Sequence, residues 1–381
     1  MTNAPADAEP DAAPETGLLP LHGLRVVEFT HVVAGPLIGL VLADLGADVL
    51  RVEPPGGEPT RRLGGFGAGF HDYYNRGKRA VALDLKTDAG LAEARRLVAG
   101  ADVLVENYAP GVMERLGLGY AACAKTAPTL VYCSLKGFLD GPYAHRVAVD
   151  EVVQMMGGLA YMTGPPGRPL RAGTSALDIT AGLFAVIAVQ AALRERERTG
   201  RGQHVRAGLY ESSAFLVGQF MAALRPDREP PPPMPARANI WPLYQLFGTA
   251  DGRPVFLAVV SDRHWRATCA AFGWADLAAD AELATHAGRV RREAGLVAEV
   301  RHRLAALPYE EVVRRCAAHN LPYAEVRSPA ELAGDEHLVG GGHLVELGAA
   351  DGHAVPVPGL PIELGGRRPS RAGRAPGLPE A

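Results

Sequence analysis

Lysine, cysteine and long apolar runs are all scarce in this chain of 381 residues. Of its 39 basic residues only four are lysine, a bias typical of a GC-rich bacterial genome and uninformative about function. The net charge of −3 excludes the strongly basic surface of a nucleic-acid-binding protein. No apolar run reaches the roughly 20 residues that span a bilayer, since the longest, 179–192, is interrupted by Gly182 and Gln190. We therefore expect no nucleic-acid partner and no membrane partner.

The spacing of the four cysteines and twelve histidines argues against a metal site. The cysteines, which lack any CxxC spacing, are Cys123, Cys133, Cys269 and Cys316. This usage predicts reduced thiols in a cytoplasmic protein. Cys316 and His319 are the only close Cys/His pair, and no second pair completes a tetrahedral site. Residues 1–19 have neither the basic nor the apolar region of a signal peptide, and we expect a disordered acidic tail.

Strand and helix patterns alternate along the first part of the chain. Short β-branched runs predict strands at 24–29, 47–53, 79–84, 102–106 and 130–134. Amphipathic or apolar segments predict helices at 37–45, 87–99 and 179–198. This alternation predicts an α/β domain around a mainly parallel sheet, which binds ligands at the carboxyl ends of its strands.

A Pro-rich stretch at 225–237 predicts a stiff linker and a domain boundary. A second, smaller unit is expected beyond it. Its predicted elements are a hairpin at 243–247 and 255–260, helices within 262–317 and a strand at 323–327. After Pro329 we expect a short helix and two strands, near 343–348 and 354–364.

Two common enzyme fingerprints are missing. The loop between the first predicted strand and helix, residues 30–36, lacks the GxGxxG glycines of a dinucleotide-binding protein, which disfavours an NAD-dependent dehydrogenase. Ser175 lacks the second glycine of GxSxG, which disfavours a serine hydrolase.

Asp178 stands between a loop and the long apolar helix, and two interpretations remain open. An aspartate there commonly caps the helix by accepting backbone N–H bonds. In the second interpretation the helix N-terminus keeps the carboxylate ionised, and an ionised carboxylate is a nucleophile for an acyl carbon. The two interpretations are compatible, because a capping carboxylate still has a free lone pair.

Other polar residues suit an anionic ligand. Asn107 and Tyr108 follow a predicted strand, where parallel sheets bind ligands. The basic residues that are either phosphate contacts or solvated surface charges are Arg76, Lys78, Lys86 and Arg115.

Several motifs in order carry a family resemblance from about residue 20 to 365. They are Phe29–Pro36, Leu45–Glu53, Asn75–Arg79 with Leu83–Lys86, Val105–Gly111, Gly157-Gly158, Asp178 and Arg198–Gln203. Together they strongly resemble the family III (CaiB/BaiF) CoA-transferases, the formyl-CoA and carnitine CoA-transferase group. That family also includes the α-methylacyl-CoA racemases.

The resemblance implies an interlocked homodimer whose subunits each have two domains. The large, Rossmann-like domain would comprise 20–224 plus 328–381. Residues 225–240 would form the linker, and 241–327 the small α+β domain.

The resemblance also implies roles for individual residues. Asp178 would attack the donor thioester, and the acyl group would pass through aspartyl anhydride and aspartyl-CoA intermediates without metal or ATP. Coenzyme A is then a substrate rather than a resident cofactor. Its contacts carry over to His31, Val33, Ala34, Leu83, Asp84, Lys86, Asn107, Tyr108, Arg115 and the segment Val147–Asp150.

Departures from the family pattern narrow the function. Val149 stands where the racemases have a histidine, so one of the two acid/base groups that racemisation needs is missing. Pro54 replaces a frequent arginine, which predicts a different adenine pocket. The segment 233–244 resembles members that act on C4–C5 dicarboxylates, and Arg237 within it is a candidate partner for a distal carboxylate.

We therefore expect a CoA-transferase that uses succinyl-CoA or a similar short acyl-CoA and a small carboxylic acid. An acyl-CoA racemase or isomerase and a non-catalytic CoA-binding homologue remain the alternatives.

Overall fold

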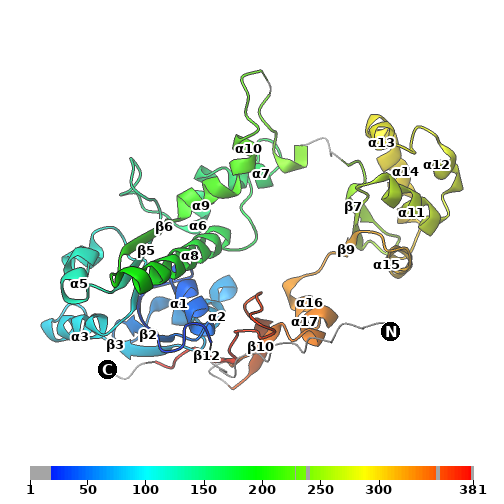
Figure 1. Ribbon diagram of the computed structural model, residues 1–381. Helices are drawn as coiled ribbons and strands as arrows, with labels where there is room; N and C mark the ends of the chain where they lie inside the picture. Colours follow the sequence, from blue (N-terminus) through cyan, green and yellow to red (C-terminus); the bar gives the residue numbers. More distant parts are fainter. Residues whose placement is uncertain (1–18, 228, 237–240, 349–351, 379–381) are drawn as a thin grey trace, which may run out of the picture. The chain divides into compact units, whose positions relative to one another are not determined.

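The computed structural model describes residues 19–227, 229–236, 241–348 and 352–378 (Figure 1). The chain forms two compact units. The larger unit combines Met1–Pro230 with Glu336–Ala381, and the smaller one comprises Pro231–Asp335. The predicted tail at 1–19 lies outside the described residues, except for Leu19.

A six-stranded sheet forms the centre of the larger unit, and every pairing in it is parallel. The strand order is β3-β2-β1-β4-β5-β6. The strands are β1 (Arg25–Phe29), β2 (Asp48–Glu53), β3 (Arg79–Ala82), β4 (Val103–Glu106), β5 (Val131–Lys136) and β6 (His204–Gly208). The first five confirm the predicted strands, whereas β6 was not predicted, because His204 and Arg206 interrupt its apolar pattern.

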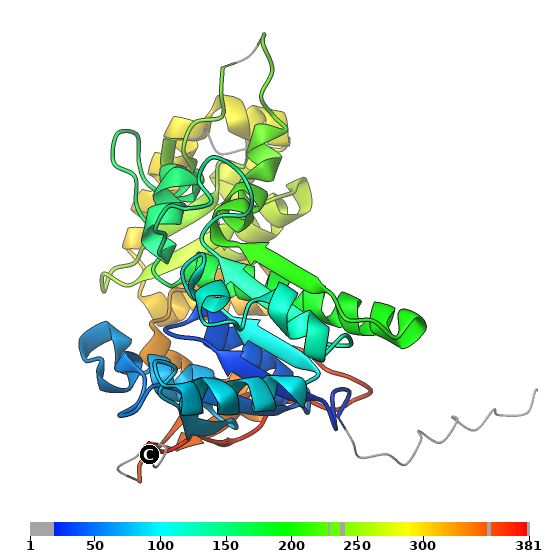
Figure 2. The same ribbon diagram turned by 90° about the vertical axis from the view of Figure 1, so that its left-hand side faces the viewer.

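Helices cover both faces of this sheet. Successive residues of a strand point to opposite faces, so alternate residues pack against different helices. Val26, Val49 and Val103 pack with α1 (Ala34–Asp44) and α8 (Ala176–Thr199). Val27 and Leu104 pack with the other face's helices, which are α3 (Asp88–Ala99), α4 (Val112–Arg115) and α5 (Tyr120–Thr126). Figure 2 shows the sheet between these layers. The predicted α/β fold with a parallel sheet is confirmed.

The helix α8 is the longest element and packs directly on α1. A Cβ atom on Gly182 would lie 2.8 Å from Cδ2 of Leu37, so glycine permits this close approach. By length and composition alone α8 could cross a membrane, contrary to the sequence-based expectation. However, its residues Leu177, Ala185 and Val189 belong to the same buried cluster as the strands, as in a core helix.

Shorter helices complete the larger unit. They are α2 (Phe70–Asn75), α6 (Asp150–Met156), α7 (Leu159–Thr163), α9 (Leu209–Leu216), α10 (Gly218–Met221) and α17 (Glu336–Gly340), with 3₁₀ turns at Pro59–Arg62 (η1) and Gly65–Gly67 (η2). The C-terminal part adds a sheet of β10 (Leu344–Gly348), β11 (Ala354–Pro358) and β12 (Gly373–Arg374). It contacts the first part directly, since Arg61 donates to the carbonyls of Pro376 and Gly377.

The smaller unit has its own antiparallel sheet, β7 (Tyr244–Gly248), β8 (Pro254–Ala258) and β9 (Tyr323–Glu325). The predicted hairpin and late strand are therefore confirmed. Its helices are α11 (Asp262–Phe272), α12 (Ala275–Ala279), α13 (His286–Arg291), α14 (Glu293–Ala305), α15 (Tyr309–Ala318) and α16 (Pro329–Leu332), and a 3₁₀ turn spans Met234–Ala236. They enclose a separate core around Trp265, Val300 and Val312.

Candidate active site

The neighbouring strands β1 and β4 mark the point where the sheet reverses its winding direction. Ligands of parallel α/β sheets bind at the carboxyl ends of the strands at such a point. His31 follows β1 and Asn107 follows β4, and the two residues are bonded to each other. The His31 backbone N–H donates to Oδ1 of Asn107 at 2.9 Å, and Nδ2 of Asn107 donates to the His31 carbonyl at 3.0 Å.

The loop from β1 to α1 adopts a tight, strained conformation beside these residues. Val32 has a φ of 63°, in the left-handed region that β-branched residues rarely occupy. A Cβ atom on Gly35 would lie 2.7 Å from Cβ of Thr30 and 2.8 Å from Cγ of Asn107. Glycine therefore lets the first turn of α1 approach Asn107, and strain of this kind is typical of functional sites.

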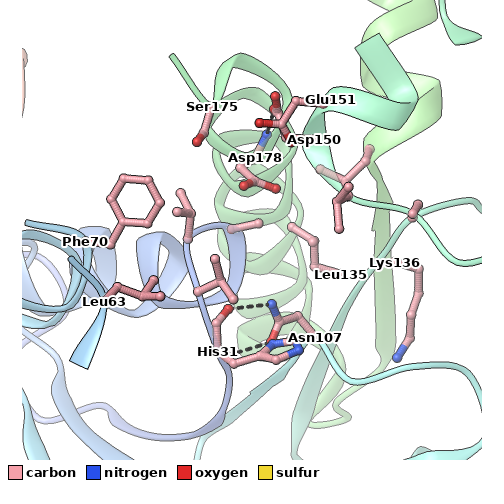
Figure 3. A pocket seen from close by; sticks show the side chains of 17 residues that line it. His31, Leu63, Phe70, Asn107, Leu135, Lys136, Asp150, Glu151, Ser175 and Asp178 are labelled. Carbon is pink, nitrogen blue, oxygen red and sulfur yellow. Dashed lines mark hydrogen bonds between the residues drawn. The ribbon is translucent and has the colours of Figure 1, made fainter. Parts of the chain in front are cut away.

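A cavity of about 380 Å³ opens at this edge of the sheet (Figure 3). Six of the predicted site residues line it: His31, Val33, Ala34, Asn107, Asp150 and Asp178. A second cavity of about 460 Å³ is lined by Tyr108 and shares seven residues with the first. Together they are large enough for an extended ligand.

Asp178 lies in the first turn of α8 with its side chain directed into the first cavity (Figure 3). The interpretation that Asp178 caps this helix is wrong. Ser175 is the N-cap residue and makes no side-chain cap bond. Instead, Oδ1 of Asp150, at the start of α6, accepts from the backbone N–H groups of Leu177 at 2.7 Å and Asp178 at 3.1 Å. The Asp178 carboxylate is therefore not used for capping.

The expectation that the helix N-terminus keeps the Asp178 carboxylate ionised is wrong, because the N–H groups of Leu177 and Asp178 donate to Asp150 instead. Burial of Asp178, followed by the charges of Asp150 and Glu151, raises its pKa from 3.8 to about 7. Glu151 is itself paired with Arg171 at 3.2 Å, but no cation is paired with Asp178 among the described residues. A carboxyl group with a pKa near neutrality is typical of reactive sites.

The second cavity has basic rather than acidic side chains. Lys136, at the end of β5, donates to Oε2 of Glu106 at 2.7 Å and to the Tyr108 carbonyl at 2.8 Å. Arg146 lies over the Tyr143 ring, 5.0 Å from its centre, and forms no ion pair among the described residues. His145 also lines this cavity. The connected cavities thus have an acidic end at Asp178 and a basic end at Arg146, whereas Lys136, which is paired with Glu106, lines both cavities.

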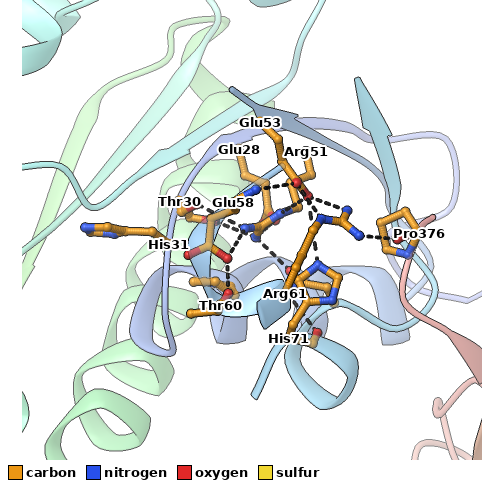
Figure 4. Close-up of polar contacts among 12 residues, drawn as sticks. Glu28, Thr30, His31, Arg51, Glu53, Glu58, Thr60, Arg61, His71 and Pro376 are labelled. Atoms are coloured by element: carbon orange, nitrogen blue, oxygen red, sulfur yellow. Dashed lines mark hydrogen bonds and ion pairs between the residues drawn. The ribbon is translucent and has the colours of Figure 1, made fainter. Parts of the chain in front are cut away.

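A buried ion-pair network stabilises the loop between β1 and α1 from behind (Figure 4). Its charges balance: the carboxylates are Glu28, Glu53 and Glu58, and the cations are Arg51, Arg61 and Lys78. Arg51 donates to the Thr30 carbonyl at 3.3 Å, and Lys78 donates to the Pro36 carbonyl at 2.8 Å. The network therefore fixes both ends of the loop that contains His31 and Val33.

Two basic residues have roles that were not predicted. Lys78 is completely buried in this network, and Arg76 pairs with the buried Asp44 at 2.7 Å. Both interpretations offered for them, phosphate contact and solvated charge, are therefore wrong. The spacing of charges along the chain could not reveal that their partners lie on β1 and α1.

The remaining predicted contacts lie elsewhere. Leu83, Asp84 and Lys86 follow β3 and line neither cavity, and Arg115 lies exposed at the end of α4. Arg237 lies outside the described residues.

Several residues that line the first cavity were not predicted as site residues, among them Lys136, Glu151 and Phe70. A signal existed for Lys136, because it is one of four lysines and follows a predicted strand.

The described residues contain no group of three or more His, Cys, Asp or Glu residues that could hold a metal ion. All four cysteines are buried free thiols. The ionisable side chains that line the cavities are those of Asp150, Asp178, Glu151, Lys136, Arg146, His31, His145 and Tyr108.

A parallel sheet with a ligand-sized cavity at its switch point and a carboxylate of raised pKa inside it is the arrangement of an α/β enzyme. Residues 21–380 match the model of CoA-transferase family III. The chain is 37% identical over 357 residues to the succinate–glutarate CoA-transferase of Agrobacterium fabrum, covering 90% of this chain and 89% of that one. It is 34% identical to the succinyl-CoA:mesaconate CoA-transferase of Haloarcula marismortui, covering 94% of both.

Solved structures agree with these relatives. A CaiB/BaiF family protein from Brucella suis matches with a TM-score of 0.85 at 34% identity, over 95% of this chain and 97% of that one. Rv3272 from Mycobacterium tuberculosis matches with a TM-score of 0.81 at 30% identity, over 94% and 97%. The chain belongs to CoA-transferase family III and is an enzyme of the CoA-transferase class.

Proposed function

We propose that this enzyme transfers CoA between two carboxylic acids, with Asp178 as the covalent nucleophile. A carboxylate oxygen of Asp178 attacks the thioester carbonyl of the donor, and the C–S bond breaks to give a mixed anhydride and CoA thiolate. The thiolate then attacks the aspartyl carbonyl, which releases the donor acid and leaves an aspartyl-CoA thioester.

The second half repeats these steps in reverse. A carboxylate oxygen of the acceptor attacks the aspartyl thioester, and CoA thiolate leaves again. The thiolate attacks the acceptor's carbonyl in the new anhydride, which forms the product thioester and regenerates the Asp178 carboxylate. Each step exchanges one acyl bond for another, so the reaction needs no metal and no ATP.

The observation that carries this proposal is the free Asp178 carboxylate in the acidic cavity, with a pKa near neutrality. A group with this pKa is about half ionised at pH 7 and is more nucleophilic than an ordinary aspartate.

The basic second cavity supports the orientation of CoA. Coenzyme A carries its negative charges on the nucleotide and diphosphate, far from its sulfur. We propose that Lys136 and Arg146 attract the phosphates and that His31, Val33, Ala34, Asn107 and Tyr108 line the path of the pantetheine arm. Leu83, Asp84, Lys86 and Arg115 remain proposed contacts for the nucleotide.

The relatives' names point to the substrates. Three of them act on succinyl-CoA or succinate together with mesaconate or glutarate. We propose succinyl-CoA as donor and a C4–C5 dicarboxylic acid as acceptor, and Arg237 as the partner of the distal carboxylate. The Arg237→Ala variant should raise KM for succinyl-CoA far more than for butyryl-CoA, and equal effects would contradict that role.

We further propose a cytoplasmic homodimer of two interlocked subunits. Each subunit would have a large domain of residues 20–224 plus 328–381, a linker at 225–240 and a small domain at 241–327. Large apolar side chains exposed on the larger unit support a partner surface, among them Ile187 on α8, Phe215 on α9 and Met221 on α10.

The decisive experiment measures intact-protein mass after incubation with succinyl-CoA and hydroxylamine. Hydroxylamine traps an activated aspartyl carbonyl as a hydroxamate, so one adduct at Asp178 is expected, and none in Asp178→Ala. The matched control is Asp140→Ala, an exposed aspartate that pairs with Arg206, which should be trapped as the wild type is.

Absence of an adduct despite CoA binding would contradict the proposal. Deuterium exchange at the α-carbon of the acyl group, without any acceptor acid, would then indicate racemase chemistry. Val149, which lines both cavities, stands where the racemases have a histidine. That histidine therefore has no counterpart at this position of the chain.

A further inference from the structure

Gln154 is a fully buried polar residue on α6, outside both cavities. It lies one turn after Asp150 on the same face of the helix. Its Nε2 donates to Oδ2 of Asp150, and its Oε1 accepts from the backbone N–H of Ala172 at 2.8 Å. Both ends of the amide are therefore used.

Asp150 connects Gln154 to the backbone of the proposed nucleophile, Asp178. While Oδ2 of Asp150 is occupied by Gln154, its Oδ1 accepts from the N–H groups of Leu177 and Asp178. The N-cap residue Ser175 contributes no side-chain cap bond, so α8 depends on Asp150 for its capping.

The chain that leads to Asp178 is consequently held at two points. Gln154 holds it at Ala172, and Asp150 holds it at Leu177 and Asp178. Both holding residues lie on α6, and Gln154 also fixes the rotamer of Asp150. A shift of this segment would move the Asp178 carboxylate relative to the bound thioester.

We propose that Gln154 is a positioning residue for CoA transfer, which aligns the Asp150 carboxylate and the segment 172–178 so that Asp178 points at the thioester. This inference rests on the proposed role of Asp178 as nucleophile. An amide satisfies both partners at every pH, because it donates to a carboxylate and accepts from an N–H group without titrating.

Glutamate at this position would keep the shape and change the hydrogen bonding. It still accepts from Ala172, but it faces the Asp150 carboxylate with a second carboxylate unless the two share a proton. Relative to the wild type at the same pH, the Gln154→Glu variant should therefore lose least activity at low pH, where the shared proton restores the bond.

The titratable groups around this pair are few. Asp178 on α8, whose pKa is raised to about 7, titrates within the tested range, so each variant is compared with the wild type at the same pH. Glu151 on α6 is paired with Arg171, and His31 lines the cavity that Asp150 and Asp178 also line. On α2, burial, with the neighbouring Tyr73 and the charges of Asp178 and Asp150, raises the pKa of Tyr74 to about 12. Tyr74 thus stays neutral over the pH range of the test.

The test compares the full-length wild type with Gln154→Glu and Gln154→Met in succinyl-CoA-dependent transfer between pH 5.5 and 8.5. Methionine keeps the volume and loses both bonds. The matched control is Gln203→Glu, because Nε2 of Gln203 donates to the Glu195 carboxylate at 2.8 Å on the exposed surface. Melting temperature and CoA affinity are measured for each variant.

For Gln154→Glu we expect kcat to fall by about 10- to 100-fold at pH 8 and by much less at pH 6, with KM for succinyl-CoA nearly unchanged. Gln154→Met should lose kcat similarly at every pH, and Gln203→Glu should behave as the wild type does. If Gln154→Glu fails to fold, Gln154→Met tests the inference instead. A positioning role predicts a lower kcat with a nearly unchanged KM for succinyl-CoA.

Wild-type kcat and pH profile in a folded Gln154 variant would overturn the inference, as would equal losses in kcat and CoA affinity. Asp178→Ala, assayed in parallel, separates the two proposals. If Asp178→Ala is inactive while the Gln154 variants are normal, only the positioning role fails. If Asp178→Ala is active, the proposed nucleophile fails.

Discussion

Two groups of carboxylates lie at the same edge of the sheet, and the pKa values of Glu53 in one and Asp178 in the other are shifted in opposite directions. Burial alone would raise the pKa of Glu53, but its contacts with His71, Arg61, the Glu58 N–H and Arg51 lower that pKa well below its usual range. Burial and neighbouring carboxylates raise the pKa of Asp178 to about 7. The difference lies in the cations: the first group has three, whereas Asp178 has none among its described contacts.

This contrast distinguishes the carboxylates that stabilise the fold from the carboxylate that we assign to the reaction. The balanced network can fix the loop between β1 and α1 because each charge has a partner, which makes burial tolerable. Asp178, which has no paired cation among the described residues, costs stability when it is ionised and titrates near neutral pH. Stability is therefore sacrificed at the position that we assign to catalysis.

Removing the positive charge of Arg51 from the buried ion-pair network should have the largest effect on stability. In Arg51→Met, three carboxylates lose their central cation, and we expect a loss of about 3–5 kcal/mol in the free energy of unfolding. Chemical denaturation measures this loss. The control Arg79→Met removes an exposed pair with Asp48 and should cost less than about 1 kcal/mol. Similar losses in both variants would contradict the contrast.

The pH dependence of activity tests the raised pKa of Asp178. The proposed mechanism requires an ionised Asp178, so kcat/KM should rise with pH and level off above about 7. We expect a value about 100-fold lower at pH 5 than at pH 8, with CoA binding measured separately as the control. A plateau that extends down to pH 5 would show that Asp178 titrates as an ordinary aspartate.

Removing the charge at Asp178 should stabilise the protein. The pKa in the folded state exceeds the unfolded value of 3.8, so the folded state loses stability as pH rises from about 4 to 7. Asp178→Asn abolishes this loss, and its gain should be about 2 kcal/mol larger at pH 8 than at pH 5. Denaturation at both pH values measures the gain, and a pH-independent effect would count against the raised pKa.

The smallest expected effect concerns Glu151. Its charge contributes to the raised pKa of Asp178, although less than burial and Asp150 do. Glu151→Gln should shift the acidic limb of the activity profile to lower pH and raise the rate at pH 6 by a few-fold. Arg171→Gln, which frees the charge of Glu151, should shift the limb the other way. Shifts in the same direction would exclude a purely electrostatic role.

Much of the fold was predictable from local patterns. The first five strands, α3 with its Thr87 N-cap, and the hairpin of β7 and β8 all carry strong periodicity or turn signals. The short helices α6, α7 and α9 were not predicted, because helices of five to eight residues form only when they pack against other elements. These missed helices include α6, which carries Asp150 and Gln154.

The sequence by itself determined the alternation of strands and helices, the family motifs and the candidacy of Asp178. Only the tertiary structure decided which charges are compensated. Asp150 and Asp178 are 28 residues apart, and Arg61 and the Pro376 carbonyl are 315 apart, yet each pair is in hydrogen-bond contact. The pKa of a buried group depends on desolvation and on such neighbours, and neither quantity is encoded in the residues next to it in the chain.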